Sequence, residues 1–437
     1  MTQRKKETLV NQLMHILKTD GVLTSQELTR KLEISRPTLS RLISKAPHSL
    51  MRLGKTRAIN YGATREIPGL GSKLPMFKVN ESGQLSAVGN FIILHKEYYA
   101  AAPQNTIFSG LPPEMFDMAP QGFMGRAFIQ KFANELNLPT RLENWSNDHI
   151  LIAISRRGED LPGNLIIGKE SAERFTKLNI NSISHKQYTN LALLSLSGQP
   201  IGSSAGGEQP KFSAYVAGRQ CIIKFAGIDH SKAQLRWKDL LISEFIALQI
   251  LKEHQISSSK AELVFQGKMV FLVVERFDRT GPKGRCAVLT LAAIENLLFG
   301  ARDSWSSSAE RLERANHIDK NTERCIKLLD AFGVMIADSD RHFHNIAFFS
   351  QSTFDHKFQT LKFKLAPAFD KLPMLFAPIS GQVIEKKFEL PIPSSEMLDV
   401  WEEARDLAIQ FWDKVSKEKT ISEHFRKIAR FCKNILL

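Results

Sequence analysis

Three polar residues near the C-terminal end constrain this chain most. Asp340 and Asn345 form an Asp-x-x-x-x-Asn element, and a second acidic residue, Asp370, follows a short distance downstream. Between them, the apolar run 346–349 predicts a strand. Phosphoryl transfer from ATP requires this order: an Asp orients the acceptor hydroxyl, and an Asn and a second Asp hold magnesium against the phosphates. The rest of the chain must then supply a lysine, its glutamate partner and a phosphate loop.

Length and composition limit the class of protein. A chain of 437 residues predicts about two to four domains. The four cysteines are widely spaced and form no Cys-x-x-Cys pair, so we expect no disulfide framework or zinc site and a reducing, cytoplasmic location. No apolar segment typical of a signal peptide follows the charged N-terminal stretch, and no uncharged apolar run reaches membrane-spanning length.

The positive charge is concentrated at the N-terminal end. The whole chain carries a net charge of +14, and residues 1–66 contain thirteen Lys/Arg against five Asp/Glu, a net of +8. A concentrated basic segment indicates a polyanionic partner, most often nucleic acid.

The pattern of residues 1–66 predicts a winged helix-turn-helix domain. Helical spacing at 8–18 is followed by a capping box, Thr24 with Glu27, and by a third helix that Ser35 caps. Residues 50–53 and 58–61 predict a hairpin with a basic tip. We expect this domain to bind double-stranded DNA, through the third helix and the wing. The candidate contacts are Arg36, Thr38, Ser40, Arg41, Lys55 and Arg57. The alternative is a small helical dimerisation module that binds no DNA.

Residues 67–185 contain no catalytic constellation and predict a mixed α/β scaffold. A Gly/Pro-rich stretch at 67–75 marks its start. The predicted strands are 77–79, 91–95, 151–154 and 164–167, and the predicted helix is 125–136.

The missing phosphate-binding parts follow in the expected order. The segment 201–212 is small, polar and glycine-rich, so the backbone N–H groups of Ser204, Ala205, Gly206 and Gly207 can face an anion. Lys224 ends a predicted strand, and Glu244 lies in the strongly helical segment 238–248. This is the arrangement of a protein-kinase N-lobe. The strand 268–277 then leads into a hinge, with Glu275 and Phe277 beside the adenine.

Together these segments resemble the HipA-type serine/threonine kinases, the toxin components of bacterial toxin–antitoxin modules. The resemblance rests on Ser204-Ala-Gly-Gly-Glu-Gln-Pro-Lys211, Ile222-Ile-Lys224, Ser243-Glu244, Val274-Glu-Arg-Phe-Asp278, Asp340-Arg-His-Phe-His-Asn345 and Pro367-Ala-Phe-Asp370. The whole chain looks like the subgroup that carries its own N-terminal helix-turn-helix.

The resemblance implies a role for each matching position. Asp340 would be the catalytic Asp, Lys224 the ATP-phosphate lysine, and Asn345 and Asp370 the Mg²⁺ ligands. Autophosphorylation would fall on Ser204, with Ser203 as a second candidate. The implied setting is the bacterial cytosol, the implied substrate class is aminoacyl-tRNA synthetases or other translation components, and an antitoxin protein is a further implied partner.

Two other functions fit part of the sequence. Asp338, Asp340, His342 and His344 alternate, so on a strand they would share one face and suit a metal-dependent nuclease or hydrolase. A transcription regulator with an inactive kinase fold is the second.

The sequence thus predicts an α+β protein in four parts. These are a winged helix-turn-helix (1–66), a HipA-like N-terminal subdomain (67–185), a kinase N-lobe (186–278) and a helical C-lobe with the catalytic loop (279–437).

Overall fold

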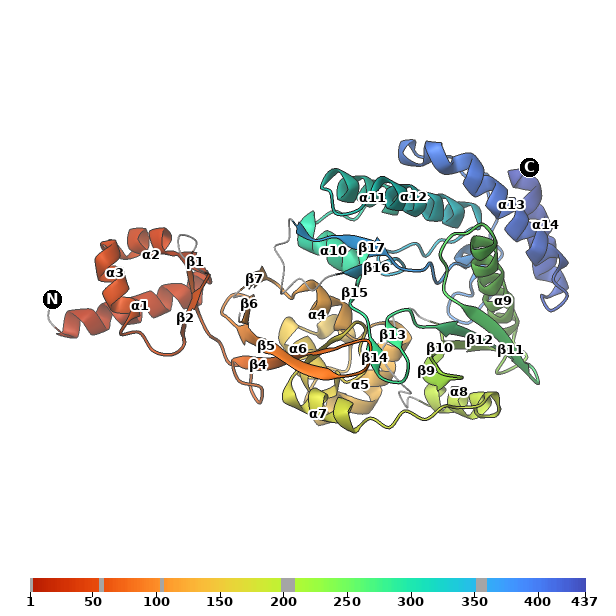
Figure 1. Ribbon diagram of the computed structural model, residues 1–437. Helices are drawn as coiled ribbons and strands as arrows, with labels where there is room; N and C mark the ends of the chain where they lie inside the picture. Colours follow the sequence, from red (N-terminus) through yellow and green to blue (C-terminus); the bar gives the residue numbers. More distant parts are fainter. Residues whose placement is uncertain (1–2, 55–58, 103–105, 198–208, 351–359) are drawn as a thin grey trace.

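The protein is a mixed α+β molecule in which several antiparallel sheets alternate with helices. The computed structural model describes residues 3–54, 59–102, 106–197, 209–350 and 360–437. Figure 1 shows the N-terminal helices at one end, the middle of the chain beside them, and the C-terminal helices at the far end. No helix in these ranges combines the length and the apolar character that a membrane crossing requires.

The N-terminal unit has its helices and hairpin where the sequence predicts them. It contains α1 (Gln3–Asp20), α2 (Ser25–Leu32), α3 (Arg36–Ile43), and strands β1 (Leu23–Thr24), β2 (Leu50–Leu53) and β3 (Asn60–Ala63), in the order β1-β3-β2. The capping box is present: the Glu27 N–H donates to Thr24 Oγ1 at 3.2 Å, and the Glu27 carboxylate accepts from the Thr24 N–H at 2.8 Å. Ser35 Oγ accepts from the Thr38 N–H at 3.4 Å and caps α3.

This unit is docked on the middle part of the chain. Leu53 of β2 is buried with Ile92, Leu94 and Ala100 in one small apolar cluster. Beside it, both terminal nitrogens of Arg65 donate to the Asp148 carboxylate, at 2.6 and 2.7 Å. A bidentate pair of this kind fixes direction as well as distance, so the N-terminal unit has a defined orientation on its neighbour.

The middle part is a five-stranded antiparallel sheet with helices around it. Its strands are β4 (Lys73–Val79), β5 (Leu85–Ile93), β6 (Tyr98–Ala102), β7 (Thr106–Ser109) and β8 (Leu165–Ile167), in the order β7-β6-β5-β4-β8. Its helices are α4 (Pro113–Met118), α5 (Gly122–Leu136), α6 (Asn147–Arg157) and α7 (Lys169–Lys177).

The strand predicted at 151–154 is wrong, because these residues lie inside α6. Ser146 caps this helix by accepting from the His149 N–H, and Leu151 and Ile154 face the buried core one turn apart. A four-residue apolar run fits a strand and a buried helical turn equally well, and here the cap upstream decides.

The next part is a four-stranded antiparallel sheet between two helices. It contains β9 (Lys211–Val216), β10 (Arg219–Ala226), β11 (Ala261–Gln266) and β12 (Met269–Glu275), in the order β11-β12-β10-β9. Side chains alternate between the two faces. Ile223, Phe225 and Phe271 meet α8 (Tyr188–Leu196) on one face, whereas Leu272 meets α9 (Lys232–Glu253) on the other. Lys224 lies opposite Leu272 and belongs to the α9 side.

The C-terminal part is mainly helical, and its helices share one large core. They are α10 (Leu291–Leu298), α11 (Trp305–Arg314), α12 (Lys320–Met335), α13 (Trp401–Lys417) and α14 (Glu423–Leu436). A small sheet of β15 (Val288–Thr290), β16 (Ala347–Ser350) and β17 (Phe363–Leu365) packs beside them, in the order β15-β16-β17. The loop between α12 and β16 carries Asp340 and Asn345 and faces the four-stranded sheet.

Candidate active site

A cavity of about 440 Å³ lies where the four-stranded sheet, the helical part and the middle part meet. Seven residues that the sequence predicts for phosphoryl transfer line it: Lys224, Glu244, Glu275, Phe277, Asp340, Asn345 and Asp370. They come from segments that span almost 150 positions of the chain, and the fold brings them to one place. Residues that are far apart in the sequence are therefore close together around this cavity.

Lys224 joins two carboxylates at the inner end of the cavity. Its Nζ donates to both oxygens of Glu244 at 2.7 Å and to Asp370 Oδ1 at 2.6 Å. Lys224 and Glu244 are almost completely buried. A buried ammonium is costly unless it is paired, and this one holds strand β10, helix α9 and the Asp370 segment together.

The two carboxyl groups that share the Lys224 ammonium have pKa values shifted in opposite directions. Burial raises the pKa of the Glu244 carboxyl to about 7, against the attraction of Lys224. Burial also opposes the charge on Asp370, but Lys224 outweighs it and lowers the pKa of this carboxyl to about 2. The charged form of Asp370 is thus strongly favoured beside the lysine.

Asp340 and Asn345 are held in a non-helical loop after α12. The Asn345 side-chain amide donates to the Asp340 carbonyl at 2.9 Å, and the Asp340 N–H donates to Asp338 Oδ1 at 3.0 Å. The backbone of Asp340 is therefore fixed, while 44% of its side chain stays exposed. Such a carboxylate can meet a hydroxyl that arrives from solvent.

Part of the cavity lining is apolar. Phe277, just after β12, packs against Phe349 and Phe369 with ring centroids 6.0 and 5.5 Å away. Ile222 and Val274 line the same region. Phe277, for which the sequence predicts an adenine contact, thus lies among aromatic and aliphatic side chains in the cavity lining.

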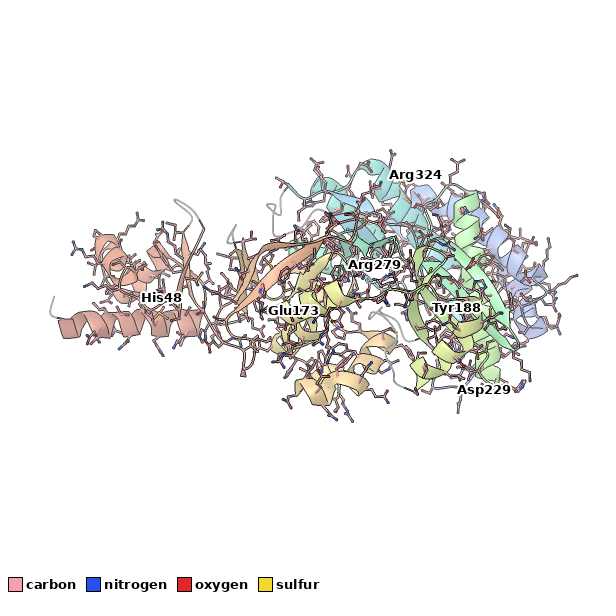
Figure 2. All side chains as sticks on the ribbon, turned by 60° about the horizontal axis from the view of Figure 1, so that its bottom comes forward. His48, Glu173, Tyr188, Asp229, Arg279 and Arg324 are labelled. Carbon is pink, nitrogen blue, oxygen red and sulfur yellow. The ribbon has the colours of Figure 1, made fainter. Side chains whose placement is uncertain are left out.

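Buried charges connect the segment after β12 to the middle part. Arg279 donates to Asp278 Oδ2 at 2.6 Å and to Asp160 Oδ1 at 3.0 Å. Burial disfavours the Asp278 charge, but Arg276 and Arg279 outweigh it and hold the pKa of this carboxyl below its usual range. Figure 2 shows Arg279 in the interior of the molecule, between the middle part and the helical part.

The donor atoms at this site suit magnesium. Asn345 uses its amide nitrogen for the Asp340 carbonyl, so its oxygen is left for a cation, and Asp370 adds a charged carboxylate. Mg²⁺ binds oxygen ligands and usually takes one or two carboxylates plus phosphate oxygens and water. Within the described ranges, no cluster of three or more His, Cys, Asp or Glu side chains forms an all-protein metal site.

The strand that would align Asp338, Asp340, His342 and His344 is not formed. These residues lie in the loop, where Asp338 is buried and His344 stacks on Phe116 with ring centroids 5.7 Å apart. Burial lowers the pKa of His344 to about 4. Asp340, His342 and His344 line the cavity and Asp338 does not, and the described residues contain no group of three or more His, Cys, Asp or Glu that could hold a metal ion, so the strand geometry expected for the metal-dependent nuclease is wrong.

The middle part supplies a wall of the cavity that the sequence did not indicate. Asp117, Gln121 and Pro162 line it, as does Lys211 of β9. Asp117 accepts hydrogen bonds from the Thr290 N–H at 2.7 Å and the Thr290 hydroxyl at 2.6 Å. These hydrogen bonds join positions 173 apart in the sequence, so no local sequence pattern predicts them.

Replacing Asp117 with Asn should stabilise the protein increasingly as the pH rises. Burial raises the pKa of the Asp117 carboxyl from 3.8 to about 7 in the folded state. Its contribution to stability is therefore full below pH 3.8 and is lost as the pH rises to 7. The variant should gain roughly 2 kcal/mol over the parent between pH 5 and pH 8. Urea unfolding of both proteins at each pH measures this, and parallel pH profiles would contradict it.

The remaining predicted residues divide into two groups. Arg36, Ser40 and Arg41 are exposed on α3, and Thr38 is partly exposed. Ser203, Ser204, Ala205, Gly206, Gly207, Lys55 and Arg57 lie outside the described residues.

Comparisons with known proteins agree with the resemblance seen in the sequence. A family model described as the HipA-like C-terminal domain matches residues 203–435, and one described as the middle domain of YjjJ-like toxins matches residues 70–176. Toxin YjjJ of Escherichia coli (strain K12) is 33% identical over 431 residues, which cover 94% of each chain.

Two solved structures are more distant. One is a chain of the Shewanella oneidensis MR-1 toxin–antitoxin complex of HipA, HipB and operator DNA, 15% identical, covering 83% of this chain and 96% of that chain with a TM-score of 0.46. The other is the Helicobacter pylori proinflammatory kinase CtkA, 12% identical, covering 53% of this chain and 88% of that chain with a TM-score of 0.37.

Proposed function

This chain belongs to the HipA-like toxins with a YjjJ-like middle domain, and from this premise we propose that it is an ATP-dependent serine/threonine-protein kinase that acts as the toxin of a toxin–antitoxin system. The observation that supports this most is the contact of Lys224 with both Glu244 and Asp370, in a cavity that Asp340 and Asn345 also line. A phosphoryl-transfer site needs these five groups within reach of one nucleotide.

Each residue has a specific role in the proposed reaction. Lys224 binds the ATP phosphates, and Glu244 keeps its ammonium in place. Asp340 orients the acceptor hydroxyl and accepts its proton. Asn345 and Asp370 would hold magnesium, which neutralises negative charge on the phosphates when bound.

The base and the phosphates have separate places in the cavity. The adenine lies at the hinge, near Glu275 and Phe277, within the apolar wall. The backbone of residues 204–207, which lies outside the described ranges, would cover the phosphates. The proposed autophosphorylation sites are Ser204 and Ser203 of the same segment. An aminoacyl-tRNA synthetase or another translation component is the proposed substrate, and an antitoxin protein is a proposed partner.

Incubation with γ-labelled ATP, Mg²⁺ and a bacterial lysate tests the proposed activity. We expect label on the protein itself at Ser203 or Ser204 and on a small number of lysate proteins, and no label without Mg²⁺. Peptide mapping identifies the sites. A parallel reaction with plasmid DNA and metal ion, but no nucleotide, tests the nuclease. DNA cleavage without any phosphotransfer would overturn the kinase proposal.

We further propose that residues 1–66 bind double-stranded DNA as a winged helix-turn-helix. The support is α3, whose exposed face carries Arg36, Ser40 and Arg41 at the end of the molecule away from the cavity (Figure 1). Thr38 lies on the same helix, and the hairpin tip with Lys55 and Arg57 would follow the phosphate backbone.

Replacing Arg36 and Arg41 together with Ala should weaken DNA binding at least about tenfold and lower the salt slope by about 2 if both contact phosphates. Binding titrations at several salt concentrations measure both effects. A matched control removes two other exposed charges, Lys18 and Lys73, which lie on α1 and β4. Equal losses in the two double variants would show a general charge effect and contradict recognition by α3.

A further inference from the structure

A lysine with almost no solvent access lies directly beside the proposed Mg²⁺ ligand. Lys371 is 1% exposed, and its ammonium has no hydrogen-bond partner among the described residues. It follows Asp370, whose backbone adopts a positive φ of 56°. A buried cation without hydrogen bonds is destabilising by itself, so its surroundings need an explanation.

Two groups contact the Lys371 ammonium directly. Asp338 is also 1% exposed, and one of its carboxylate oxygens lies 3.7 Å from Lys371 Nζ. The ring of Trp305, at the start of α11, has its centroid 3.8 Å from the same nitrogen. The first contact is an ion pair too long for a hydrogen bond, and the second is a cation–π contact.

Asp338 connects this lysine to the catalytic loop. Its other carboxylate oxygen accepts from the Asp340 N–H at 3.0 Å, and its backbone carbonyl accepts from the Arg341 guanidinium. Arg341 also donates to Asp330 of α12 at 3.1 Å. The Asp340 N–H is therefore held by Asp338, and the Asp340 carbonyl is held by the Asn345 amide. The first of these hydrogen bonds uses the same carboxylate that faces Lys371.

Lys371 is also the next residue in the chain after Asp370, the proposed Mg²⁺ ligand. Lys371 and Asp338 thus connect the Asp370 segment to the Asp340 segment through one ion pair that lies outside the cavity lining. For stability alone, apolar side chains of the same size serve as well or better than a buried ion pair. The position of this pair between two functional loops suggests another role.

We propose that Lys371 and Asp338 are positioning residues for phosphotransfer, which hold Asp340 at a fixed separation from Asp370. This inference rests on the proposed kinase function. Neither side chain lines the cavity, so the pair acts through the backbones of Asp340 and Asp370 and touches neither ATP nor the acceptor.

The test separates positioning from stability by removing both charges at once. In Asp338→Asn/Lys371→Met the amide oxygen can still accept from the Asp340 N–H, and no unpaired charge stays buried, so the melting temperature should remain close to that of the parent. We expect kcat for phosphotransfer to fall about 10- to 100-fold, with the KM for ATP changed less than about threefold. The single variant Lys371→Met leaves Asp338 unpaired and should lose stability as well.

A second buried ion pair in the same helical part provides the matched control. Lys327 and Glu323 on α12 lie 3.0 Å apart and are both largely buried, and neither lines the cavity. Glu323 also pairs with Lys320 and Lys327 also pairs with Glu310, so Glu323→Gln/Lys327→Met leaves two charges without their partners and should lower the melting temperature, but it should not change kcat. If the Asp338/Lys371 double variant keeps both its melting temperature and its kcat, the pair has no positioning role and the proposal is overturned.

Hydrogen–deuterium exchange provides a readout that does not depend on kinase activity. The segment 336–346 should exchange faster in Asp338→Asn/Lys371→Met and at the parental rate in the control. A parent protein that neither binds ATP nor transfers phosphate would refute the proposed function, and the exchange rates would still decide whether the pair holds the loop. Unchanged exchange in 336–346 would refute the positioning role independently.

Discussion

Phosphotransfer from ATP should fall by about three orders of magnitude in Asp340→Ala, because the acceptor hydroxyl loses the group that orients it and accepts its proton. The fold should remain intact. The Asp340 side chain is nearly half exposed, and the side chains of Asp338 and Asn345 hold Asp340 through its backbone N–H and carbonyl, which the alanine variant keeps. ATP affinity should change little, since Lys224 and the apolar wall remain. Transfer of γ-labelled phosphate and calorimetric ATP binding measure the two quantities.

The matched control for this variant is Asp399→Ala, which removes an exposed carboxylate on the same helical part. It should keep both activity and ATP binding. If Asp340→Ala labels itself or a substrate at the parental rate, Asp340 is not the catalytic base. If it loses ATP binding and melts early, the residue contributes to the fold and the assignment of its role fails on different grounds.

The residues that the sequence predicted best are those whose local pattern carries information. Lys224 falls in the predicted strand, within β10, and Glu244 falls in the predicted helical segment, within α9, which is buried at almost every position from 239 to 251. The Asp340–Asn345 spacing is itself local. Each of these patterns can be read within about ten residues, because strand and helix periods are short. The order of the segments predicts the pairing of Lys224 with Glu244, but it does not predict the contact of Lys224 with Asp370.

Other parts of the site depend on contacts that no local pattern records. Asp117 reaches Thr290 across 173 positions, and Phe116 stacks on His344 from the same helix. The middle part, predicted as a scaffold without chemistry, therefore forms one wall of the cavity. The alternation from Asp338 to His344 has the period of a strand, but these residues lie in a loop in which Asp338 is buried beside Lys371. In both cases the tertiary contacts, and not the local sequence pattern, decide where these residues lie.

Lys224→Met should have the second largest effect, and it should change both activity and stability. Without the ammonium, the ATP phosphates lose their cationic partner, and we expect phosphotransfer to fall about 100- to 1,000-fold. Glu244 and Asp370 are then left close together in a buried site with no positive charge between them. Two carboxylates in this arrangement cannot both ionise, so the pair takes up a proton near neutral pH.

This proton uptake gives the variant a specific pH dependence. When folding raises the pKa of a carboxyl, its contribution to stability is present at low pH and is lost as the pH rises through the folded value. In the parent, Lys224 lowers the pKa of Asp370 to about 2, so Asp370 favours the folded state at neutral pH. In Lys224→Met the pKa of the carboxyl pair is raised instead of lowered. The variant should therefore lose stability, relative to the parent, as the pH rises from 5 to 8. Urea unfolding across this range measures the difference.

The double variant Lys224→Met/Glu244→Gln separates the two consequences of losing the lysine. It leaves a single buried carboxylate, Asp370, and removes the repulsion between two. Most of the stability lost at pH 8 should return, whereas phosphotransfer should stay low because the phosphate ligand is still missing. A recovery of activity in the double variant would mean that Lys224 serves only to neutralise Glu244. Stability losses that are equal at pH 5 and pH 8 would mean that the two carboxylates are not coupled, contrary to the 2.7 and 2.6 Å contacts that Lys224 makes with them.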